Sequence, residues 1–241
     1  MKKIVNLMLA VAFAFVVTGC EKESTGGVTK ITYYPVLELI GDDAVTIQIG
    51  DTYTDEGCVA TLNGVDVSDQ IEVSTNLDTD KSGFYSYIYS IANEDGFSAS
   101  ISREVAVVDY SSIASAYPNV SISFSNAAYT WSDGRFNFKT SISHVQDNIY
   151  LIDDVILLYD QYLYPGYPYD FKVECWFTLN DDNTLTLVAV GDDYFEFAED
   201  IEDVGGFAEG SCYDPETGTV TIIFRPSPMV SADEHKLTLK K

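Results

Sequence analysis

Residues 83–108 read GFYSYIYSIANEDGFSASISREVAVV, and this stretch decides the fold class. In its first half every second residue is large, so that one face of an extended chain carries Tyr85, Tyr87, Tyr89 and Ile91. Strict alternation of this kind is typical of a half-buried β-strand. The turn sequence Asn93–Gly96 then leads into a second run, 97–108. The stretch therefore predicts two long strands joined by a tight turn.

The residues before this stretch continue the pattern of short strands and turns. Asn63-Gly64 lies between two apolar runs, 59–62 and 65–67, and this dipeptide is a strong signal for a tight hairpin turn. From Ile31 onward, no long stretch shows a helical period. Several short strands at this spacing predict a β-sandwich over residues 31–109.

Several short motifs in this region resemble a bacterial immunoglobulin-like surface module. They are Gly50-Asp51-Thr52-Tyr53, Glu56-Gly57, Gly83-Phe84-Tyr85, Asp95-Gly96 and Arg103-Glu104-Val105-Ala106-Val107. Their glycine and aromatic positions fall in the order of the module. The resemblance implies an immunoglobulin-like fold and a spacer role for residues 31–109, and it implies no binding site.

A short polar connection begins at Asp109, and we place a second β domain at residues 117–241. Alternating faces recur there, in 136–143 and 173–179, and Asp214–Gly218 is a turn with Pro early and Gly late. About eight strands in this length predict a second antiparallel β-sandwich or a small β-barrel. The whole chain is therefore expected to be all-β.

The N-terminus has the pattern of an export signal. Lys2 and Lys3 precede an apolar run, 7–17, which is too short for a membrane-spanning helix of about 20 residues. The run ends in Val17-Thr18-Gly19-Cys20, which resembles a lipobox. The resemblance implies a lipid on Cys20, and two or more acyl chains anchor a protein stably in a membrane. The alternative is an ordinary signal peptide with a chance cysteine.

Residues 1–19 are therefore the expected lipoprotein signal peptide, and residues 20–30 the expected lipidated cysteine and flexible tether. The acidic cluster Glu21–Ser24 resembles the surface-export signal of Bacteroidetes-type lipoproteins. That resemblance implies a location on the outer membrane, facing the cell exterior. A plain solvated tether is the alternative, because glycine, serine and charged residues make flexible linkers.

The composition excludes two classes of protein. The chain has 13 Lys and Arg against 38 Asp and Glu, a net charge of −25, which repels phosphate backbones and argues against nucleic-acid partners. Hydrophobic residues make up 46% of the chain, which is ample for packed cores and argues against disorder. Because the negative charge also keeps the folded body away from anionic head groups, we expect the membrane contact to be made by lipid.

Three cysteines remain besides Cys20. Cys175 and Cys212 fall in the same predicted domain, and the sequence leaves open whether they form a disulfide. Cys58 is interpreted as a small buried residue. The cysteine and histidine spacings do not suggest a zinc site.

The strongest candidate for ligand binding is a tyrosine-rich stretch in the second domain. Two prolines and a glycine exclude a regular central strand, so we expect a loop or an edge. Tyrosine offers a flat face for the apolar side of a sugar and a hydroxyl for hydrogen bonds, and the neighbouring polar groups add further contacts. A packed cap over one end of the barrel is the alternative. The predicted glycan-binding residues are Tyr159, Asp160, Gln161, Tyr162, Tyr164, Tyr167 and Tyr169, with Trp176 as a weaker candidate.

Metal binding and catalysis have little support in the sequence. The carboxylates in Asp192–Asp203 are dense enough for calcium, but they lack the EF-hand order, so we interpret them as a solvated acidic loop. No nucleophile, zinc-protease or phosphate-loop motif occurs, and His144 and His235 are interpreted as surface residues. We therefore expect neither an enzyme nor a cofactor.

The arrangement as a whole resembles two-domain Bacteroidetes-type surface lipoproteins. The resemblance rests on the signal region, the immunoglobulin-like motifs, the stretch Tyr213–Thr219 and the final Leu237-Thr238-Leu239-Lys240. It implies a setting in polysaccharide utilisation, with a polysaccharide as ligand and an outer-membrane transporter as partner. We therefore predict a glycan-binding surface lipoprotein. The alternatives are a structural or adhesion lipoprotein that binds another protein, and a glycan hydrolase with two facing carboxyl groups.

Overall fold

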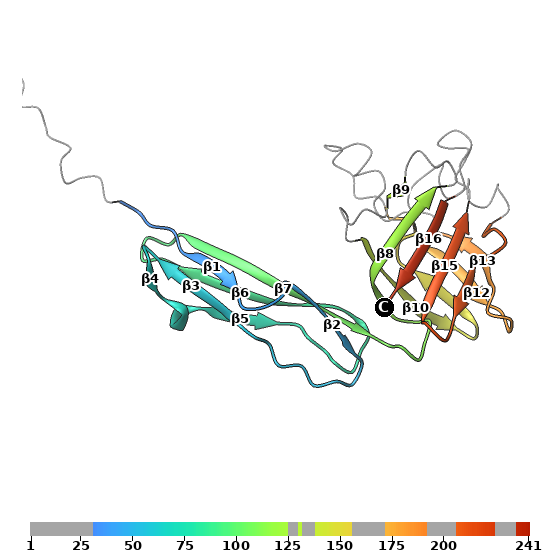
Figure 1. The fold of residues 1–241 in the computed structure, drawn as a ribbon, viewed down its shortest axis with the longest axis horizontal. Coiled ribbons are helices and arrows are strands. Elements are labelled where there is room, and N and C mark those ends of the chain that lie inside the picture. Colours follow the sequence, from blue (N-terminus) through green and yellow to red (C-terminus); the bar gives the residue numbers. More distant parts are fainter. Residues whose placement is uncertain (1–30, 125–129, 132–137, 156–171, 192–205, 225–234) are drawn as a thin grey trace, which may run out of the picture.

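The computed structural model describes residues 31–124, 130–131, 138–155, 172–191, 206–224 and 235–241. The described residues form three β-sheets, and their only helical element is a short 3-10 helix, η1 (Ser68–Gln70). Two of the sheets make an elongated N-terminal part, and the third makes a barrel-shaped C-terminal part (Figure 1). The prediction of an all-β fold is confirmed.

The N-terminal part packs a three-stranded sheet against a four-stranded sheet. The smaller sheet has the order β1 (Val36–Leu39), β3 (Cys58–Leu62), β4 (Val65–Asp66). The larger has the order β2 (Ala44–Gln48), β7 (Ser98–Val108), β6 (Gly83–Ala92), β5 (Glu72–Thr75). The long antiparallel pair β6–β7 is the hairpin predicted from residues 83–108, and its register pairs Gly83 with Val107 and Ala92 with Ser98.

The turn between β3 and β4 has the geometry that its sequence predicts. Asn63 and Gly64 both take positive φ angles, 51° and 75°, as a tight hairpin turn requires. Tyr89 and Ile91 of β6 point into the space between the sheets and are buried. There Ile91 packs with Ala60 and Val67, so the core of this part is small.

The chain changes sheet between β1 and β2. Strand β1 pairs with β3 in the smaller sheet, whereas β2 pairs in parallel with β7 in the larger sheet. The crossover spans residues 40–43, where Gly41 takes a φ of 82° that suits glycine. Because its backbone groups leave both ladders here, the crossover needs other hydrogen-bond partners.

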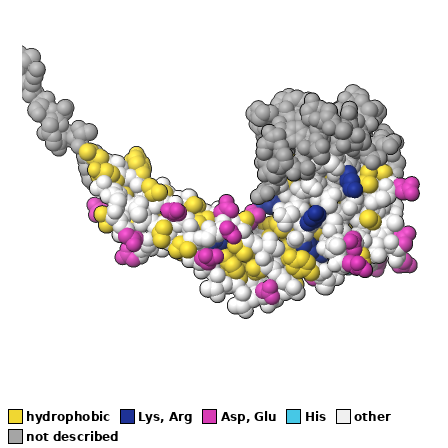
Figure 2. Space-filling model, in the orientation of Figure 1, with side chains coloured by type: hydrophobic (Ala, Val, Ile, Leu, Met, Phe, Trp, Pro, Cys, Tyr) yellow, Lys and Arg dark blue, Asp and Glu magenta, His cyan; other side chains and the backbone are white. Residues whose placement is uncertain are grey.

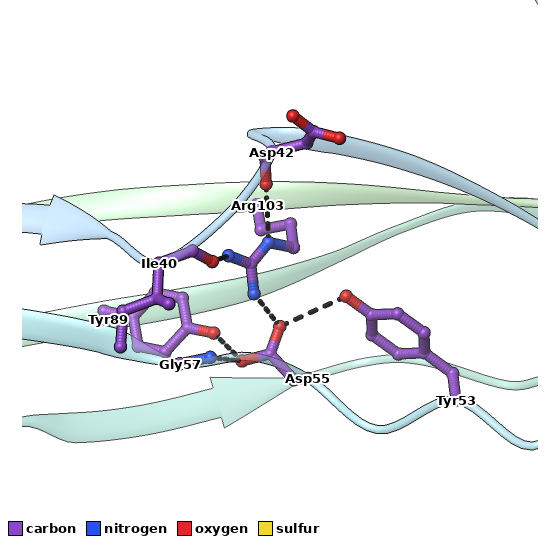
Figure 3. Close-up of polar contacts among 7 residues, drawn as sticks. All are labelled: Ile40, Asp42, Tyr53, Asp55, Gly57, Tyr89 and Arg103. Atoms are coloured by element: carbon purple, nitrogen blue, oxygen red, sulfur yellow. Dashed lines mark hydrogen bonds and ion pairs between the residues drawn. The ribbon is translucent and has the colours of Figure 1, made fainter.

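Arg103 of β7 supplies those partners from inside the sandwich (Figure 3). Its Nε donates to the carbonyl of Asp42 at 2.8 Å, and its Nη2 donates to the carbonyl of Ile40. Its Nη1 forms an ion pair with Asp55, whose carboxylate also accepts hydrogen bonds from the Tyr89 hydroxyl and, at 2.8 Å, from the Gly57 amide. The Arg103 side chain is 1% exposed and that of Asp55 12% exposed, so water screens this pair little.

The C-terminal part is a closed antiparallel barrel. Along its sheet the strands are β13 (Leu185–Val190), β12 (Cys175–Leu179), β11 (Ile149–Ile152), β10 (Phe138–Gln146), β8 (Ala116–Phe124), β16 (His235–Lys240), β15 (Thr219–Phe224) and β14 (Cys212–Asp214), and β9 (Thr130–Trp131) pairs beside β8. The ends of this sheet meet, because the Leu185 amide donates to the Ser211 carbonyl at 3.0 Å and the Tyr213 amide to the Asn183 carbonyl at 2.9 Å. The barrel alternative of the prediction is therefore the observed one.

Side chains fill the inside of the barrel, as expected for a ring of eight strands. Every strand of the ring contributes at least one residue to a single buried cluster, in which each residue is 8% exposed or less. Its members include Val120, Ile142, Ile152, Phe177, Leu185, Tyr213, Ile222 and Leu237. Phe177 lies near its centre, with its ring 5.9 Å from that of Tyr150 and 6.2 Å from that of Phe207.

Two interpretations of single residues are wrong, and the open disulfide question is answered. His235 is 4% exposed, because it alternates with Leu237 and Leu239 on the inner face of β16. Cys58 is half-buried rather than buried. Cys175 and Cys212 are free thiols on two strands that β13 separates.

The two parts are joined by packed and hydrogen-bonded residues. The Ser82 hydroxyl donates to the Val107 carbonyl and accepts from the Ala116 amide, each at 2.8 Å, so it links β7 to β8. Across the same junction Lys139 of β10 forms an ion pair with Glu104 of β7. The connection is also tied to the end of the chain, because Lys241 Nζ donates to the Ser112 carbonyl at 2.6 Å.

We expect acid to destabilise the N-terminal part through Asp55. Burial raises the pKa of this carboxyl, but the hydrogen bonds from Tyr89, Arg103 and Gly57 outweigh burial and lower the pKa overall. A carboxyl with a lowered folded pKa stabilises the fold above its unfolded pKa of about 3.9, and this contribution is lost as the pH falls through the folded pKa. Urea unfolding followed by circular dichroism between pH 7 and pH 2 measures the effect.

Asp55→Asn is expected to flatten this pH dependence, because an amide does not titrate. It should also lower the free energy of unfolding at pH 7 by about 3–5 kcal/mol, because Arg103 would remain buried without its counter-ion. Asp69→Asn, at an exposed position of η1, is the matched control and should behave as the wild type. An Asp55→Asn protein with the same stability and pH profile as the wild type would contradict this role.

Truncating the barrel core at Phe177 should cost far more than truncating its surface. Phe177→Ala removes a fully buried ring, and we expect the free energy of unfolding to fall by about 3–5 kcal/mol. Val188→Ala, where the side chain is 50% exposed, should change it by about 0.5 kcal/mol or less. Equilibrium unfolding followed by the fluorescence of Trp131 and Trp176 reports the stability of the barrel. Equal losses in the two variants would refute the core assignment.

Candidate functional site

Most of the predicted ligand-binding residues lie outside the described residues. This holds for Tyr159, Asp160, Gln161, Tyr162, Tyr164, Tyr167 and Tyr169, and also for Cys20 and the acidic stretch 192–203. The structure does describe Trp176 and the barrel residues that border these segments. The candidate site is therefore built from Trp176 and from those borders.

The two ends of the tyrosine-rich segment are neighbours on the edge of the barrel. Val155, just before the segment, and Val173, just after it, are buried, and the Val155 amide donates to the Val173 carbonyl at 2.9 Å. The described residues that flank the segment are therefore hydrogen-bonded to each other, next to the strand pair β11 and β12. The sequence alone did not indicate this closeness.

Asp154 holds these two ends in place. Its carboxylate accepts a hydrogen bond from the Val173 amide at 3.3 Å, and its carbonyl accepts one from the Thr140 hydroxyl at 3.1 Å. Asp154 is 5% exposed. Burial, together with the charge of Asp154, raises the pKa of the Cys175 thiol to about 12. Cys175 is therefore an inert core residue at ordinary pH.

Trp176 lies on the outer face of β12, between the buried residues Cys175 and Phe177. Its cross-strand neighbours are Leu151 of β11 and Ala189 of β13. A side-chain carbon built on Gly191 would lie 3.6 Å from the indole ring, so the indole packs beside Gly191. Since glycine and alanine are the smallest neighbours available, part of the indole stays exposed and the side chain is only half-buried.

Polar groups accompany Trp176 on this face. Glu174 lies two residues earlier on the same side of β12 and is half-buried, and its carbonyl accepts a hydrogen bond from the Gly191 amide at 2.8 Å. Nearby, Lys172 Nζ is 3.5 Å from a carboxylate oxygen of Asp153. An aromatic surface bordered by hydrogen-bonding groups is a usual form of a sugar contact. The sequence did contain a signal for Glu174, because a residue two positions before Trp176 lies on the same side of an extended chain. The tyrosine-rich stretch was chosen as the candidate instead.

This edge of the barrel also borders the acidic segment. Gly191, the last described residue before the stretch 192–203, lies beside Trp176. No group of three or more His, Cys, Asp or Glu side chains that suits a metal ion occurs among the described residues. Calcium binding by the stretch 192–203 itself lies outside the part of the chain that the structure describes.

In the described part of the chain, no helix has the length and apolar character that crossing a membrane requires.

The N-terminal part matches a known family of domains. Residues 37–107 match the family model described as a bacterial surface protein, Ig-like domain. The match covers β1 to β7 with the exception of their outermost residues, and it agrees with the resemblance seen in the sequence motifs. A comparison with curated proteins finds no match.

Solved structures resemble the chain to different degrees. A lipoprotein from Bacteroides thetaiotaomicron matches with a TM-score of 0.57 and 21% identity, over 86% of this chain and 100% of that chain. A Clostridium perfringens ZmpB chain with the M60 catalytic domain and two CBM51 domains has a TM-score of 0.28 and 14% identity, over 87% of this chain and 21% of that chain. ZmpB CBM51 in complex with GlcNAc, with INT domains, has a TM-score of 0.26 and 12% identity, over 86% and 44%. The first match shows a shared fold, and the other two are too distant to carry an argument.

Proposed function

We propose that this protein is a non-catalytic surface lipoprotein that binds a glycan at the edge of its C-terminal barrel, with the immunoglobulin-like part as a spacer. The observation that carries the proposal is the position of Trp176. This half-exposed indole lies on β12, three residues after Val173, which follows the tyrosine-rich segment, and it lies beside Gly191. Trp176 therefore lies close to the described residues, Val155 and Val173, that flank the tyrosine-rich segment in the sequence.

The rigidity of this edge supports binding. Ligand affinity is lost when side chains or loops must be ordered on binding, so a site on packed strands keeps more of its interaction energy. Trp176 lies between two fully buried core residues, and Asp154 ties the neighbouring strand ends together. The alternating pattern of β12 therefore presents the indole outward from a fixed backbone.

The arrangement of the two parts supports a spacer role. The first described residues lie at the end of the N-terminal part that is remote from the barrel (Figure 1). A lipid on Cys20 would therefore hold that end at the membrane, and the length of the β6–β7 hairpin would separate the barrel from it. The contacts at Ser82 and between Lys139 and Glu104 make the junction stiffer than a flexible linker.

The setting completes the proposal. We place the protein on the outer membrane facing the cell exterior, with a polysaccharide as ligand and an outer-membrane transporter of a polysaccharide-utilisation system as partner. These assignments follow from the lipobox-like Cys20 and from the resemblance to Bacteroidetes-type surface lipoproteins.

One observation favours the adhesion alternative. Tyr34 and Phe97 form an exposed aromatic pair on the N-terminal part, with ring centroids 5.1 Å apart and exposed fractions of 61% and 45%. Exposed aromatic side chains are enriched where proteins bind one another. If a protein partner binds at this pair, the N-terminal part is a binding domain and not only a spacer.

Affinity electrophoresis of residues 22–241 tests the proposal against plant, host and microbial polysaccharides. We expect retardation by one glycan class, and we expect Trp176→Ala and the double variant Tyr164→Ala/Tyr167→Ala to lose it, because each buried aromatic contact contributes about 1–3 kcal/mol. Tyr34→Ala is the matched control, since it removes an exposed aromatic ring remote from the barrel. Circular dichroism checks that each variant is folded.

Three results would argue against the proposal. Absence of retardation across the panel would favour the adhesion alternative. Retardation that survives in all the barrel variants would exclude this edge as the site. Release of shorter sugars from a retained polysaccharide would favour the hydrolase alternative.

A further inference from the structure

One face of the barrel differs in charge from the rest of the protein. The neighbouring strands β10, β8, β16 and β15 contain no Asp or Glu, although the whole chain has 38 acidic residues against 13 Lys and Arg. These strands carry Lys139, Lys236 and Lys240. Figure 2 shows lysine and arginine side chains on the barrel face turned to the viewer, and acidic side chains on the right-hand and lower sides of the barrel.

Two of these lysines are not neutralised. Lys139 forms an ion pair with Glu104, and its Nζ lies 5.0 Å from the centre of the Phe84 ring. Lys236 and Lys240 are exposed, and within the described part of the chain neither forms an ion pair or a hydrogen bond through its side chain. They lie on the outer side of β16, four residues apart, which corresponds to about 13 Å along a strand.

Small hydroxyl side chains occupy the surface between the two lysines. Thr238 lies midway, and its direct cross-strand neighbours are Ser121 of β8 and Thr221 of β15. These residues are half-buried, and their hydroxyls make no hydrogen bond to the described residues. The face therefore presents a row of hydroxyl groups that have no hydrogen-bond partner among the described residues, with an ammonium group on either side of the row.

We propose that this face, formed by Ser121, Thr221, Lys236, Thr238 and Lys240, binds an anionic polysaccharide whose sugar units carry carboxylate or sulfate groups. This inference rests on the proposed function in one respect, namely that the ligand is a glycan. It adds a second binding surface, and it specifies that the ligand is negatively charged. The lysines donate charge-assisted hydrogen bonds to the anionic groups, which are about twice as strong as neutral ones. The hydroxyls donate to and accept from the sugar hydroxyls, because each is both a donor and an acceptor.

The net charge of −25 does not prevent this binding. At physiological salt the Debye length is about 8 Å, so distant carboxylates are largely screened while charges in contact are not. The carboxylate of Glu104, on the neighbouring N-terminal part, is already paired with Lys139. A flexible acidic protein would satisfy the lysines equally well, but it would leave the row of hydroxyls without a regular partner.

Residues 22–241 are tested by affinity electrophoresis in gels that contain polygalacturonate, chondroitin sulfate or neutral dextran. We expect retardation by one or both anionic polymers, and the polymer that retards the protein shows whether carboxylate or sulfate groups are recognised. The retardation should weaken as salt is added, because salt screens the charges. Lys236→Gln/Lys240→Gln should weaken the interaction about tenfold or more, because both charge-assisted contacts are lost. Lys30→Gln/Lys81→Gln, with the same change in net charge outside the barrel, should behave as the wild type.

The outcomes separate this inference from the proposed function. Retardation by neutral glycans that depends on Trp176 and is unchanged in Lys236→Gln/Lys240→Gln would leave the proposed function standing and overturn the inference. Anionic binding that is lost in the lysine variant but retained in Trp176→Ala would establish this face as a separate site. Sedimentation that shows a wild-type dimer and a monomeric lysine variant would overturn the inference in favour of a second copy of the chain. Binding of no anionic polymer would also overturn it.

Discussion

The buried ion pair between Arg103 and Asp55 is the interaction on which the N-terminal part depends. A charge buried without a partner costs several kcal/mol, so the guanidinium must find acceptors within its reach. It finds them in Asp55 and in the carbonyls of Ile40 and Asp42, at the place where the chain leaves one sheet for the other. One side chain thus satisfies the carbonyl groups of the crossover, holds Asp55 in the segment before β3 and joins the two sheets. The apolar core of this part is small, so a polar network supplies the specificity that packing does not.

The C-terminal barrel follows a different principle. Its ring of strands closes through hydrogen bonds at the starts of β13 and β14, from Leu185 to Ser211 and from Tyr213 to Asn183, and its interior is filled by side chains. A filled interior has no room for a ligand, so contacts with partners belong on the outer faces and at the strand ends. Trp176 and the row of hydroxyls around Thr238 lie on two such outer faces. Each face is an open outer surface of the sheet, so an extended polymer can lie across several strands.

Net charge and local charge give different information about this protein. The overall excess of carboxylates keeps the chain soluble and repels polyanions at long range. Within about 8 Å, however, only neighbouring groups matter, and the strands around β16 present ammonium and hydroxyl groups without carboxylates. The net charge of the whole chain therefore predicts which partners are repelled at long range. The side chains of a single sheet face determine which partner is bound in contact.

The sequence by itself determined those features that depend on near neighbours in the chain. Alternation in residues 85–91 predicted the long strand β6, and Asn63-Gly64 predicted the hairpin turn between β3 and β4. The same rule, applied to His235 with Leu237 and Leu239, would have predicted its burial, but the interpretation of histidine as a surface residue took precedence.

Only the tertiary structure decided the features that join distant segments. Asp55 and Arg103 are 48 residues apart, and Ser121, Thr221 and Thr238 become neighbours only because β8 and β15 both pair with β16. The placement of β1 and β2 in different sheets likewise depends on which strands they meet. Alternation reports which side of a strand a residue occupies, but it contains no information about which strand lies beside it. Pairing between strands is settled by the packing of the whole barrel and sandwich, and the candidate sites on their outer faces exist only once that pairing is made.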